Sequence, residues 1–435
     1  MMRILDLRGA DAARLVSGET IPRPDVDVSQ ASAAAAELIA EVRERGAEAL
    51  REHAERFDGV RREELRATDA ELAAALRSLD PKVRDALETV IERVRAVSGA
   101  QLPQTVSTTL GTGALVEQRW QPVGRVGLYV PGGKAVYPSS VVMNAVPAQV
   151  AGVGSIALAS PPQRDFGGSV HPSILAAAAL LGVDEVYAMG GASAIGAFAY
   201  GVPELDLTSV DVVTGPGNVF VAAAKRLVRG IVGIDAEAGP TEILIIADSA
   251  ADPALVAADL VSQAEHDELA AAVLVTWLPE LADAVAAELT RIVAQTPHRA
   301  RVEAALSGQQ SAVVLVDDAA SAARFSDSYA PEHLELLTAD NELLLTSIHS
   351  AGAIFVGPHS PVSLGDYLAG SNHVLPTGGQ ARFTPGLGVH SFLRPQQIIR
   401  YDETGLSEAE PRIRALATAE DLPAHADAVT ARLRR

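Results

Sequence analysis

Short apolar runs alternate with helix-like segments over most of the chain, and this alternation is the strongest constraint on its fold. The expected strands cover residues 125–130, 155–159, 184–189, 210–214, 242–247, 273–276, 312–316, 333–337 and 353–356. The expected helices between them cover residues 173–181, 192–200, 220–228, 278–295, 319–326 and 343–349. A βαβ series folds into parallel sheets with right-handed crossovers, so the sequence predicts an α/β fold. A join near residues 236–241 separates two successive α/β units.

The two ends of the chain depart from this alternation. Residues 1–24 are polar and charged, and we expect a helical arm that packs outside its own core. Residues 29–97 show helical periodicity with many charges, which predicts a solvated helical layer. After about residue 388 come a strand-like piece and two helical segments, at 397–401, 411–417 and 424–433. This tail is too small to fold alone, so it must pack on the body or on another subunit.

Composition narrows the class of protein. A chain of 435 residues is long enough for two or more domains, and its net charge of −20 argues against a nucleic-acid or anionic-membrane partner. The chain has no cysteine, which excludes disulfides, thiolate metal sites and a cysteine nucleophile. The N-terminus has no apolar signal-peptide core and no apolar run is long enough to span a bilayer, so the cytoplasm is the expected location.

One helix end offers donors for a metal. Asp252 and Pro253 are typical of a helix start, and the apolar residues of 253–261 recur at helical spacing. Gln263 and His266 follow three residues apart, so a helix would place an amide oxygen and an imidazole nitrogen on one face. Taken alone, such a pair is more often ordinary helix surface.

A second stretch offers a general base. Glu332 and His333 are adjacent at the start of an expected strand, where a carboxylate beside an imidazole suits proton transfer at neutral pH. In isolation, such a dipeptide is more often an ordinary feature of the surface. His373 lies further on in a loop of small residues, not far from Asp366.

Glycine-rich turns follow three of the expected strands, at 131–133, 190–191 and 215–217. Two of them precede helices, whose free N–H groups favour phosphate, although tight βα turns are an equally good interpretation. The chain has no complete Gly-x-Gly-x-x-Gly motif, so a standard dinucleotide site is not supported by motif.

Eight motifs in order resemble the histidinol dehydrogenase family, and the resemblance runs essentially from end to end. The motifs are Gly127-Leu-Tyr-Val-Pro-Gly-Gly133, Gly215-Pro-Gly-Asn218, Ala238-Gly-Pro-Thr-Glu242, Ser262-Gln-Ala-Glu-His266, Pro331-Glu-His333, Gly365-Asp-Tyr367, Asn372-His-Val-Leu-Pro376 and Ala419-Glu-Asp-Leu-Pro-Ala-His425. The resemblance implies an NAD-dependent enzyme of histidine biosynthesis that oxidises L-histidinol to L-histidine through histidinal, reducing two NAD⁺. Its fold would be two incomplete Rossmann-like domains, similar to aldehyde dehydrogenases, with terminal segments exchanged across a homodimer.

The resemblance also implies a role for each matching residue. His333 would be the base for the alcohol and Glu332 would activate water in the second step. One zinc ion per subunit would be held by Gln263, His266, Asp366 and His425. Substrate would contact Thr241, Gln263, His266, His333, Asp366, His373, Glu420 and His425, with Glu420 and His425 donated by the neighbouring subunit. NAD would contact Tyr129, Ser193 and Asn218.

The same resemblance suggests a division of the chain. The expected parts are an arm over 1–24, a nucleotide-side domain over 129–237, a larger discontinuous domain over 25–128 and 238–386, and a C-terminal segment over 387–435 that packs on the partner. The absence of cysteine fits this chemistry, because hydride must then leave an aldehyde hydrate and a base for water is needed.

Two positions depart from the family pattern. Ser193 stands where glutamine is usual, which shortens a polar reach toward NAD and could admit a water. Thr241 stands where serine is common and keeps the hydroxyl. These departures leave open a related zinc- and NAD-dependent dehydrogenase for another amino alcohol. Two further hypotheses are a metal-bound structural protein without catalysis and a zinc hydrolase in which Glu332 activates water.

Overall fold

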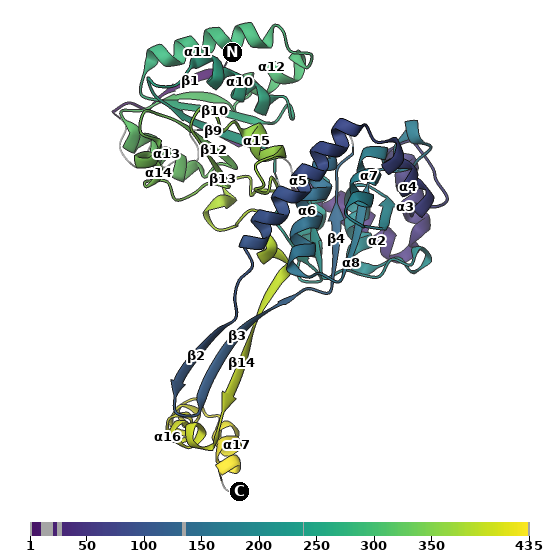
Figure 1. Cartoon of the computed structure of the whole chain (residues 1–435), viewed down its shortest axis with the longest axis vertical. Helices are drawn as coiled ribbons and strands as arrows, with labels where there is room; N and C mark the ends of the chain where they lie inside the picture. The colour runs from purple at the N-terminus through teal and green to yellow at the C-terminus, as the bar shows by residue number, and fades with distance from the viewer. Residues whose placement is uncertain (1, 10–20, 24–27, 133–135, 238, 434–435) are drawn as a thin grey trace.

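The computed structural model describes residues 2–9, 21–23, 28–132, 136–237 and 239–433, and shows two α/β lobes and a projecting arm (Figure 1). Gly133 and Ala238 of the motifs above, and much of the expected N-terminal arm, lie outside the described residues. The parallel α/β architecture predicted from the sequence is confirmed. No helix within the described ranges is long and apolar enough to cross a membrane.

The first lobe is built on a six-stranded, fully parallel sheet. Its order is β1 (Arg3–Asp6), β11 (Ala312–Leu315), β10 (Ala271–Thr276), β9 (Glu242–Ala247), β12 (His333–Leu337) and β13 (Ala353–Val356). One face packs on α10 (Pro253–Ala264), α11 (Pro279–Val293), α12 (Arg299–Ser307) and α15 (Val362–Tyr367). The other face packs on α13 (Ala319–Tyr329) and α14 (Asn341–Leu345). Both faces are therefore covered, as parallel sheets require.

The N-terminal segment corrects the expectation of a helical arm. Residues Arg3–Asp6 form an edge strand that pairs in parallel with β11 of the same chain. Leu7 and Ile21 are buried against the same sheet. This pairing satisfies backbone groups that would otherwise lie open at the sheet edge, which explains why a short, charged segment becomes a strand.

The second lobe is built on a five-stranded parallel sheet. Its order is β6 (Glu185–Ala188), β5 (Ser155–Ser160), β4 (Arg125–Tyr129), β7 (Val212–Thr214) and β8 (Gly233–Ile234). One face packs on α4 (Asp69–Ser78), α5 (Pro81–Ala100), α6 (Pro138–Ala151) and α7 (Pro172–Leu180). The other packs on α2 (Val28–Arg45), α3 (Ala47–Phe57), α8 (Gly191–Tyr200) and α9 (Val219–Val228).

The position of the N-terminal helices differs from the expected grouping of 25–128 with 238–386. The apolar face of α5, which holds Leu87, Val90, Ile91 and Val94, is buried in the core of the five-stranded lobe. Buried residues of α2 and α3 lie in the core on the opposite face of that sheet. The described part of 28–100 therefore belongs by packing with the five-stranded sheet.

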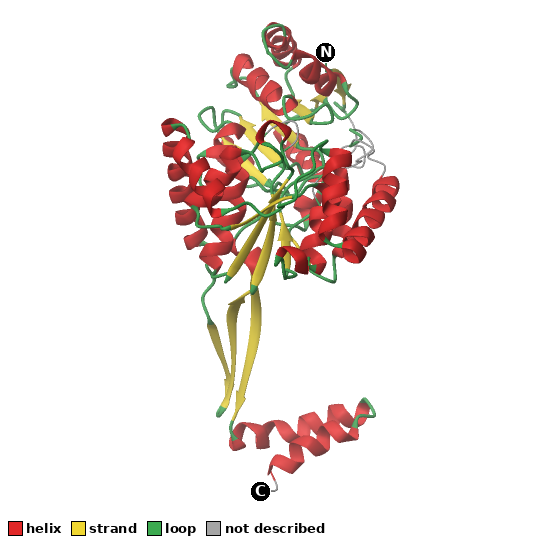
Figure 2. Ribbon diagram, turned by 90° about the vertical axis from the view of Figure 1, so that its right-hand side faces the viewer, coloured by secondary structure: helices red, strands yellow, loops and turns green. Residues whose placement is uncertain are grey.

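An antiparallel arm leaves the body of the molecule. Its strands are β2 (Val106–Gly111), β3 (Ala114–Pro122) and β14 (Leu393–Tyr401), in the order β14-β3-β2. Figures 1 and 2 show it extending away from both lobes, with α16 (Glu403–Ala419) and α17 (Pro423–Leu433) at its far end. Short 3₁₀ turns lie at Arg164–Phe166, Pro203–Leu205, Gln380–Arg382 and Val389–Phe392.

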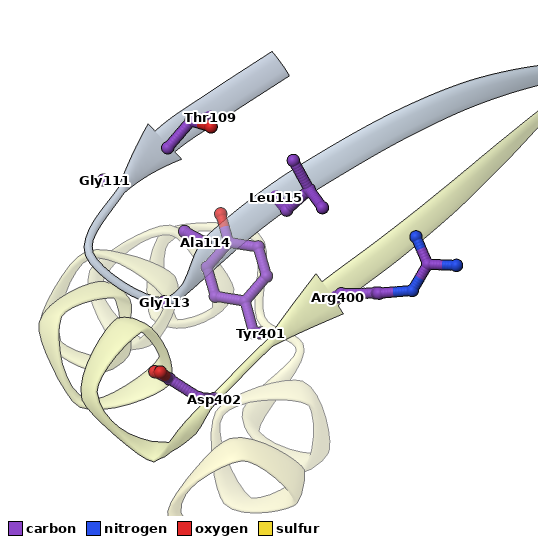
Figure 3. A pocket seen from close by; sticks show the side chains of 8 residues that line it. All are labelled: Thr109, Gly111, Gly113, Ala114, Leu115, Arg400, Tyr401 and Asp402. Carbon is purple, nitrogen blue, oxygen red and sulfur yellow. The ribbon is translucent and has the colours of Figure 1, made fainter. Parts of the chain in front are cut away.

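A glycine fixes the tip of this arm. The amide of Asp402 donates to the Gly113 carbonyl (2.9 Å), and a Cβ on Gly113 would lie 1.8 Å from the Asp402 carboxylate. The Asp402 side chain accepts from the amide of Gly405 (2.9 Å) and so caps α16. Figure 3 shows the open hollow beside this junction, lined by Thr109, Gly111, Gly113, Ala114, Leu115, Arg400, Tyr401 and Asp402. The residues predicted for the active site do not line this hollow.

Candidate active site

Glu332 and His333 lie at the amino end of β12, between β9 and β13. Ala330 adopts a left-handed conformation (φ 49°) and Pro331 follows, which turns the chain from α13 into the strand. Both the carboxyl of Glu332 and the imidazole of His333 are buried. The two groups predicted to act as bases are therefore shielded from bulk water and lie side by side, with 3.5 Å between Glu332 Oε2 and His333 Nδ1.

Glu332 is held by a chain of hydrogen bonds. Its Oε2 accepts from the hydroxyl of Thr241 (2.6 Å) and from the amide of Glu242 (3.0 Å). The Thr241 hydroxyl in turn accepts from Nε2 of Gln263 (2.7 Å). Burial raises the pKa of Glu332 to about 8, against the opposing effect of these two donors. Glu332 therefore titrates close to neutral pH, which suits a general base.

The tautomer of His333 follows from its partner. Its Nδ1 lies 3.1 Å from the backbone carbonyl of Glu242, and a carbonyl can only accept, so Nδ1 carries the hydrogen. The Nε2 atom is then the basic nitrogen. Burial lowers the pKa of His333, which keeps the ring neutral and able to take up a proton at neutral pH.

Three of the four predicted metal donors, Gln263, His266 and Asp366, lie in the same lobe as this pair. Asp252 caps α10 by accepting from the Ala254 amide (2.9 Å), as predicted, and the helix ends at Ala264. His266 follows within one further turn, and its Nε2 lies 3.9 Å from Oδ2 of Asp366 on α15. The amide nitrogen of Gln263 is bound to Thr241, which leaves Oε1 as the atom available to a cation.

These residues give an incomplete set of donors within one chain. In the described part of the structure no three His, Cys, Asp or Glu residues form a metal-binding group. Gln263, His266 and Asp366 would supply three nitrogen and oxygen donors, whereas a closed four-ligand zinc site takes a fourth donor from protein.

His373 connects the two lobes. Its Nδ1 lies 2.9 Å from the Asp366 carbonyl and its Nε2 lies 3.0 Å from the hydroxyl of Ser140 on α6. Since the carbonyl fixes the hydrogen on Nδ1, Nε2 accepts from Ser140. Ser140 escaped prediction because α6 itself was not expected. This helix is buried on nearly every side and so lacks an amphipathic period.

Two predicted site residues are not brought to this place. Glu420 ends α16 and His425 lies on α17, both exposed at the far end of the arm (Figures 1 and 2). The contacts above join Thr241, Gln263, Glu332 and His333. His266 and Asp366 form a second pair, and the charge of Asp366 acts on His333. The sequence order of the motifs gives no indication of this separation.

The predicted cofactor residues surround a topological switch point. Strands β4, β5 and β6 extend the sheet in one direction, whereas β7 and β8 lie on the other side of β4. Tyr129 ends β4, and Asn218 caps α9 after β7 by accepting from the amides of Phe220 (3.1 Å) and Val221 (3.2 Å). Nucleotides bind parallel α/β sheets at such a crevice, outside the carboxyl ends of the strands.

Tyr129 contacts the start of α8, and Ser193 lies on α8 and contacts α3. The Tyr129 hydroxyl accepts from the amide of Gly191 (3.1 Å), and burial raises its pKa to about 12. Ser193 is buried, and its hydroxyl lies 2.8 Å from Nδ1 of His53. The other ring nitrogen of His53 lies 3.1 Å from Glu41. The shorter side chain at position 193 is thus tied to α3 rather than left unpaired.

A nucleotide-type switch point in the five-stranded lobe and a buried carboxylate–imidazole pair in the six-stranded lobe are the features of an NAD-dependent dehydrogenase of α/β fold. The family model for histidinol dehydrogenase matches residues 21–433. The chain is 66% identical to histidinol dehydrogenase from Leifsonia xyli over 431 residues, covering 99% of each chain. It is 57% identical to the Mycobacterium tuberculosis enzyme of that name over 434 residues, covering 99% of this chain and 98% of the relative.

A solved structure agrees with these sequence matches. The crystal structure of histidinol dehydrogenase from Elizabethkingia anophelis superposes with a TM-score of 0.93 at 31% identity, covering 100% of this chain and 98% of that one. The chain therefore belongs to the histidinol dehydrogenase family. The predicted activity, NAD-dependent oxidation of histidinol in histidine biosynthesis, is confirmed by this membership.

Proposed function

We propose that the site converts L-histidinol to L-histidine through L-histidinal in two oxidations, with His333 as base in the first and Glu332 in the second. The observation that supports this division is the pair itself. Two buried bases lie 3.5 Å apart, and each is held by different hydrogen-bond partners. Burial raises the pKa of Glu332 and lowers the pKa of His333. Two groups with different proton affinities and reach can serve two successive steps.

In the first oxidation, Nε2 of His333 takes the hydroxyl proton of histidinol. The hydride leaves the carbinol carbon for NAD⁺, and the product is the aldehyde. The neutral ring needed for this step follows from the lowered pKa of His333. The bond from Nδ1 to the Glu242 carbonyl keeps Nε2 directed away from the strand as the basic atom.

In the second oxidation, Glu332 takes a proton from water as the water adds to the aldehyde. The resulting hydrate anion loses a hydride from the same carbon to a second NAD⁺, which leaves the carboxylic acid. The chain has no cysteine that could form a thiohemiacetal, so the hydride must leave a hydrate that is formed with activated water. The hydrogen bonds from Thr241 and the Glu242 amide stabilise the ionised carboxylate that this step requires.

We also propose that Gln263, His266 and Asp366 hold a zinc ion together with His425 of a second copy. The donor set fits zinc, since it consists of imidazole nitrogen, amide oxygen and carboxylate. When bound, zinc would orient the imidazole and amine of the substrate. Thr241, His333 and His373 of the same copy and Glu420 of the second copy would complete the substrate pocket.

The arm supports a homodimer. It carries exposed apolar side chains at Val106, Leu110, Ile399, Tyr401, Leu416 and Leu422. A thin three-stranded sheet with such a surface needs a partner to cover it. A second copy both covers the arm and receives Glu420 and His425 at its own site. The cytoplasm remains the predicted location.

The function is tested by incubating zinc-loaded protein with limiting L-histidinol and excess NAD⁺. We expect two NADH and one L-histidine per histidinol. A panel of other amino alcohols separates this reaction from that of a related dehydrogenase, because a shifted specificity would give a higher kcat/KM for one of them. No NADH with any substrate would instead favour a hydrolase or a structural protein.

A further inference from the structure

A buried ion pair lies next to the turn that follows β7 in the five-stranded lobe. Lys225 on α9 and Asp235 after β8 contact each other through Nζ and Oδ1, and their side chains are only 2% and 4% exposed. Two charges removed from water cost free energy unless their remaining hydrogen bonds are satisfied. The contacts described above for the catalytic, metal and substrate residues do not involve this pair, so it needs its own explanation.

The two charged groups bind the two polar backbone groups of Gly215. Oδ2 of Asp235 accepts from the Gly215 amide (2.8 Å), and Nζ of Lys225 donates to the Gly215 carbonyl (3.0 Å). The cation therefore binds the acceptor and the anion binds the donor of the same residue. Charge-assisted hydrogen bonds of this kind are stronger than those between neutral groups.

Gly215 itself is held where no other residue fits. Its φ is 118°, and a Cβ at this position would lie 1.9 Å from the carbonyl oxygen of Tyr129. Just before it, the Thr214 hydroxyl donates to Asn144 of α6 (2.8 Å). The turn after β7 is thus held at Gly215 by the ion pair and at Thr214 by α6. It lies against the end of β4.

This turn leads directly into the proposed cofactor contacts. It runs from Gly215 to Asn218, where α9 begins, and it passes Tyr129 at the switch point. A phosphate at such a place is bound by backbone amides, whose directions depend on the conformation of the turn. Anything that sets the backbone of 215–218 therefore sets the affinity for a dinucleotide.

We propose that Lys225 and Asp235 are positioning residues for NAD⁺, which fix the 215–218 turn in its binding conformation without touching the cofactor. This rests on the proposed cofactor role of Tyr129 and Asn218. Loss of the pair should weaken NAD⁺ binding while the bases, metal donors and histidinol contacts in the other lobe stay in place. A purely structural ion pair would instead lower thermal stability and leave the KM for NAD⁺ unchanged.

The chain offers a matched control at the opposite end of the same sheet. Arg125 at the start of β4 makes two hydrogen bonds to Glu185 at the start of β6 (2.8 and 2.6 Å), with side chains 14% and 20% exposed. This pair spans β5 at the amino ends of the strands, whereas the 215–218 turn follows the carboxyl end of β7. Glu185→Gln therefore measures the cost of weakening an ion pair in this lobe without disturbing the turn.

The experiment compares Lys225→Met, Asp235→Asn, their double variant and Glu185→Gln with the wild type. Isothermal titration of NAD⁺ without histidinol, KM for both substrates, kcat and the melting temperature are measured for each zinc-loaded protein. In the Lys225 and Asp235 variants we expect Kd and KM for NAD⁺ to rise by about 10- to 100-fold, with KM for histidinol changed by less than about twofold. Glu185→Gln should lower the melting temperature without raising the KM for NAD⁺.

The double variant has no unpaired buried charge, so it tests the idea even where a single variant folds poorly. The proposal is overturned if the folded variants bind NAD⁺ as tightly as Glu185→Gln does. NAD⁺ binding in the absence of histidinol separates this result from a failure of the proposed function. A wild type that binds NAD⁺ but does not oxidise L-histidinol would refute the reaction and leave the positioning role standing.

Discussion

The hydroxyl of Thr241 donates to Glu332 across 2.6 Å and at the same time accepts from the amide nitrogen of Gln263. It thereby connects the proposed base for water to a proposed metal donor. Both hydrogen-bonding functions of the hydroxyl are used, so the shape of the side chain matters less than the oxygen itself. Either threonine or serine at position 241 could therefore make both contacts.

Thr241→Ser should retain activity within about threefold, whereas Thr241→Val should lower kcat/KM for histidinal by about 10- to 100-fold. Valine has the same shape but leaves the Gln263 amide without this partner and leaves Glu332 with the Glu242 amide alone. Steady-state kinetics with L-histidinal as substrate measure the effect. Equal activity of the serine and valine variants would show that the hydroxyl is dispensable.

The two oxidations should differ in their dependence on pH. His333 acts as a neutral base, and its pKa is lowered from 6.5, so the histidinol step should persist in mildly acidic solution. Glu332 must be ionised and its pKa is about 8, so kcat/KM for histidinal should rise between pH 6 and about 8 and then level off. A flat profile for histidinal across this range would remove Glu332 from the role of base.

The shared site can be tested by mixing inactive subunits. His425→Asn should lose zinc, and His333→Asn should keep zinc but lose turnover. A heterodimer of the two has one site with an intact body and an intact His425 from the other copy. Random mixing should therefore recover about a quarter of wild-type activity. Absence of recovery, with heterodimers demonstrated by mass spectrometry, would mean that each copy supplies its own His425.

A buried carboxyl behind the site should limit stability at high pH. Burial, with the nearby Asp259, raises the pKa of Glu335 from 4.5 to about 9. The folded protein therefore binds a proton that the unfolded chain releases between those values, so stability falls as pH rises through this window. Glu335→Gln should be more stable than wild type at pH 8, by on the order of 1–3 kcal/mol.

This advantage should disappear toward pH 4, where both states of the wild type are protonated at this position. Thermal melts of the two proteins at pH 4.5 and 8 measure the difference, with Glu342→Gln on the exposed face of α14 as a control. If the two melting curves differ by the same amount at both pH values, the proton is not held by Glu335.

Local signals in the sequence predicted the parts of the site that lie on single elements. The Asp252 cap and apolar spacing placed Gln263 in the last turn of α10, and the apolar run after Pro331 placed His333 at the start of β12. His266 lies two residues beyond the end of α10, so the expectation that one helix face carries both Gln263 and His266 was wrong. Glycine-rich turns follow β4, β6 and β7 as predicted, and their role in binding a cofactor stays a prediction.

Contacts between segments that are distant in the sequence could not be predicted from local sequence patterns. Ser140 meets His373 across 233 positions, on a helix whose uniform burial hides its periodicity. The pairing of β1 with β11 joins an edge strand of four residues, Arg3–Asp6, to Ala312–Leu315, which lies far along the sequence. The separation of His425 from its proposed partners depends on the direction of the arm, and residue spacing does not determine that direction.

The most direct test of the account is the behaviour of Glu332→Gln and His333→Asn with each substrate separately. NADH formation is followed from L-histidinol and from L-histidinal, with zinc content and melting temperature checked for both variants. Glu332→Gln should lose the histidinal step much more than the histidinol step, so that one NADH is formed per histidinol and the aldehyde accumulates. Equal loss of both steps in Glu332→Gln would contradict the division of the two oxidations between Glu332 and His333.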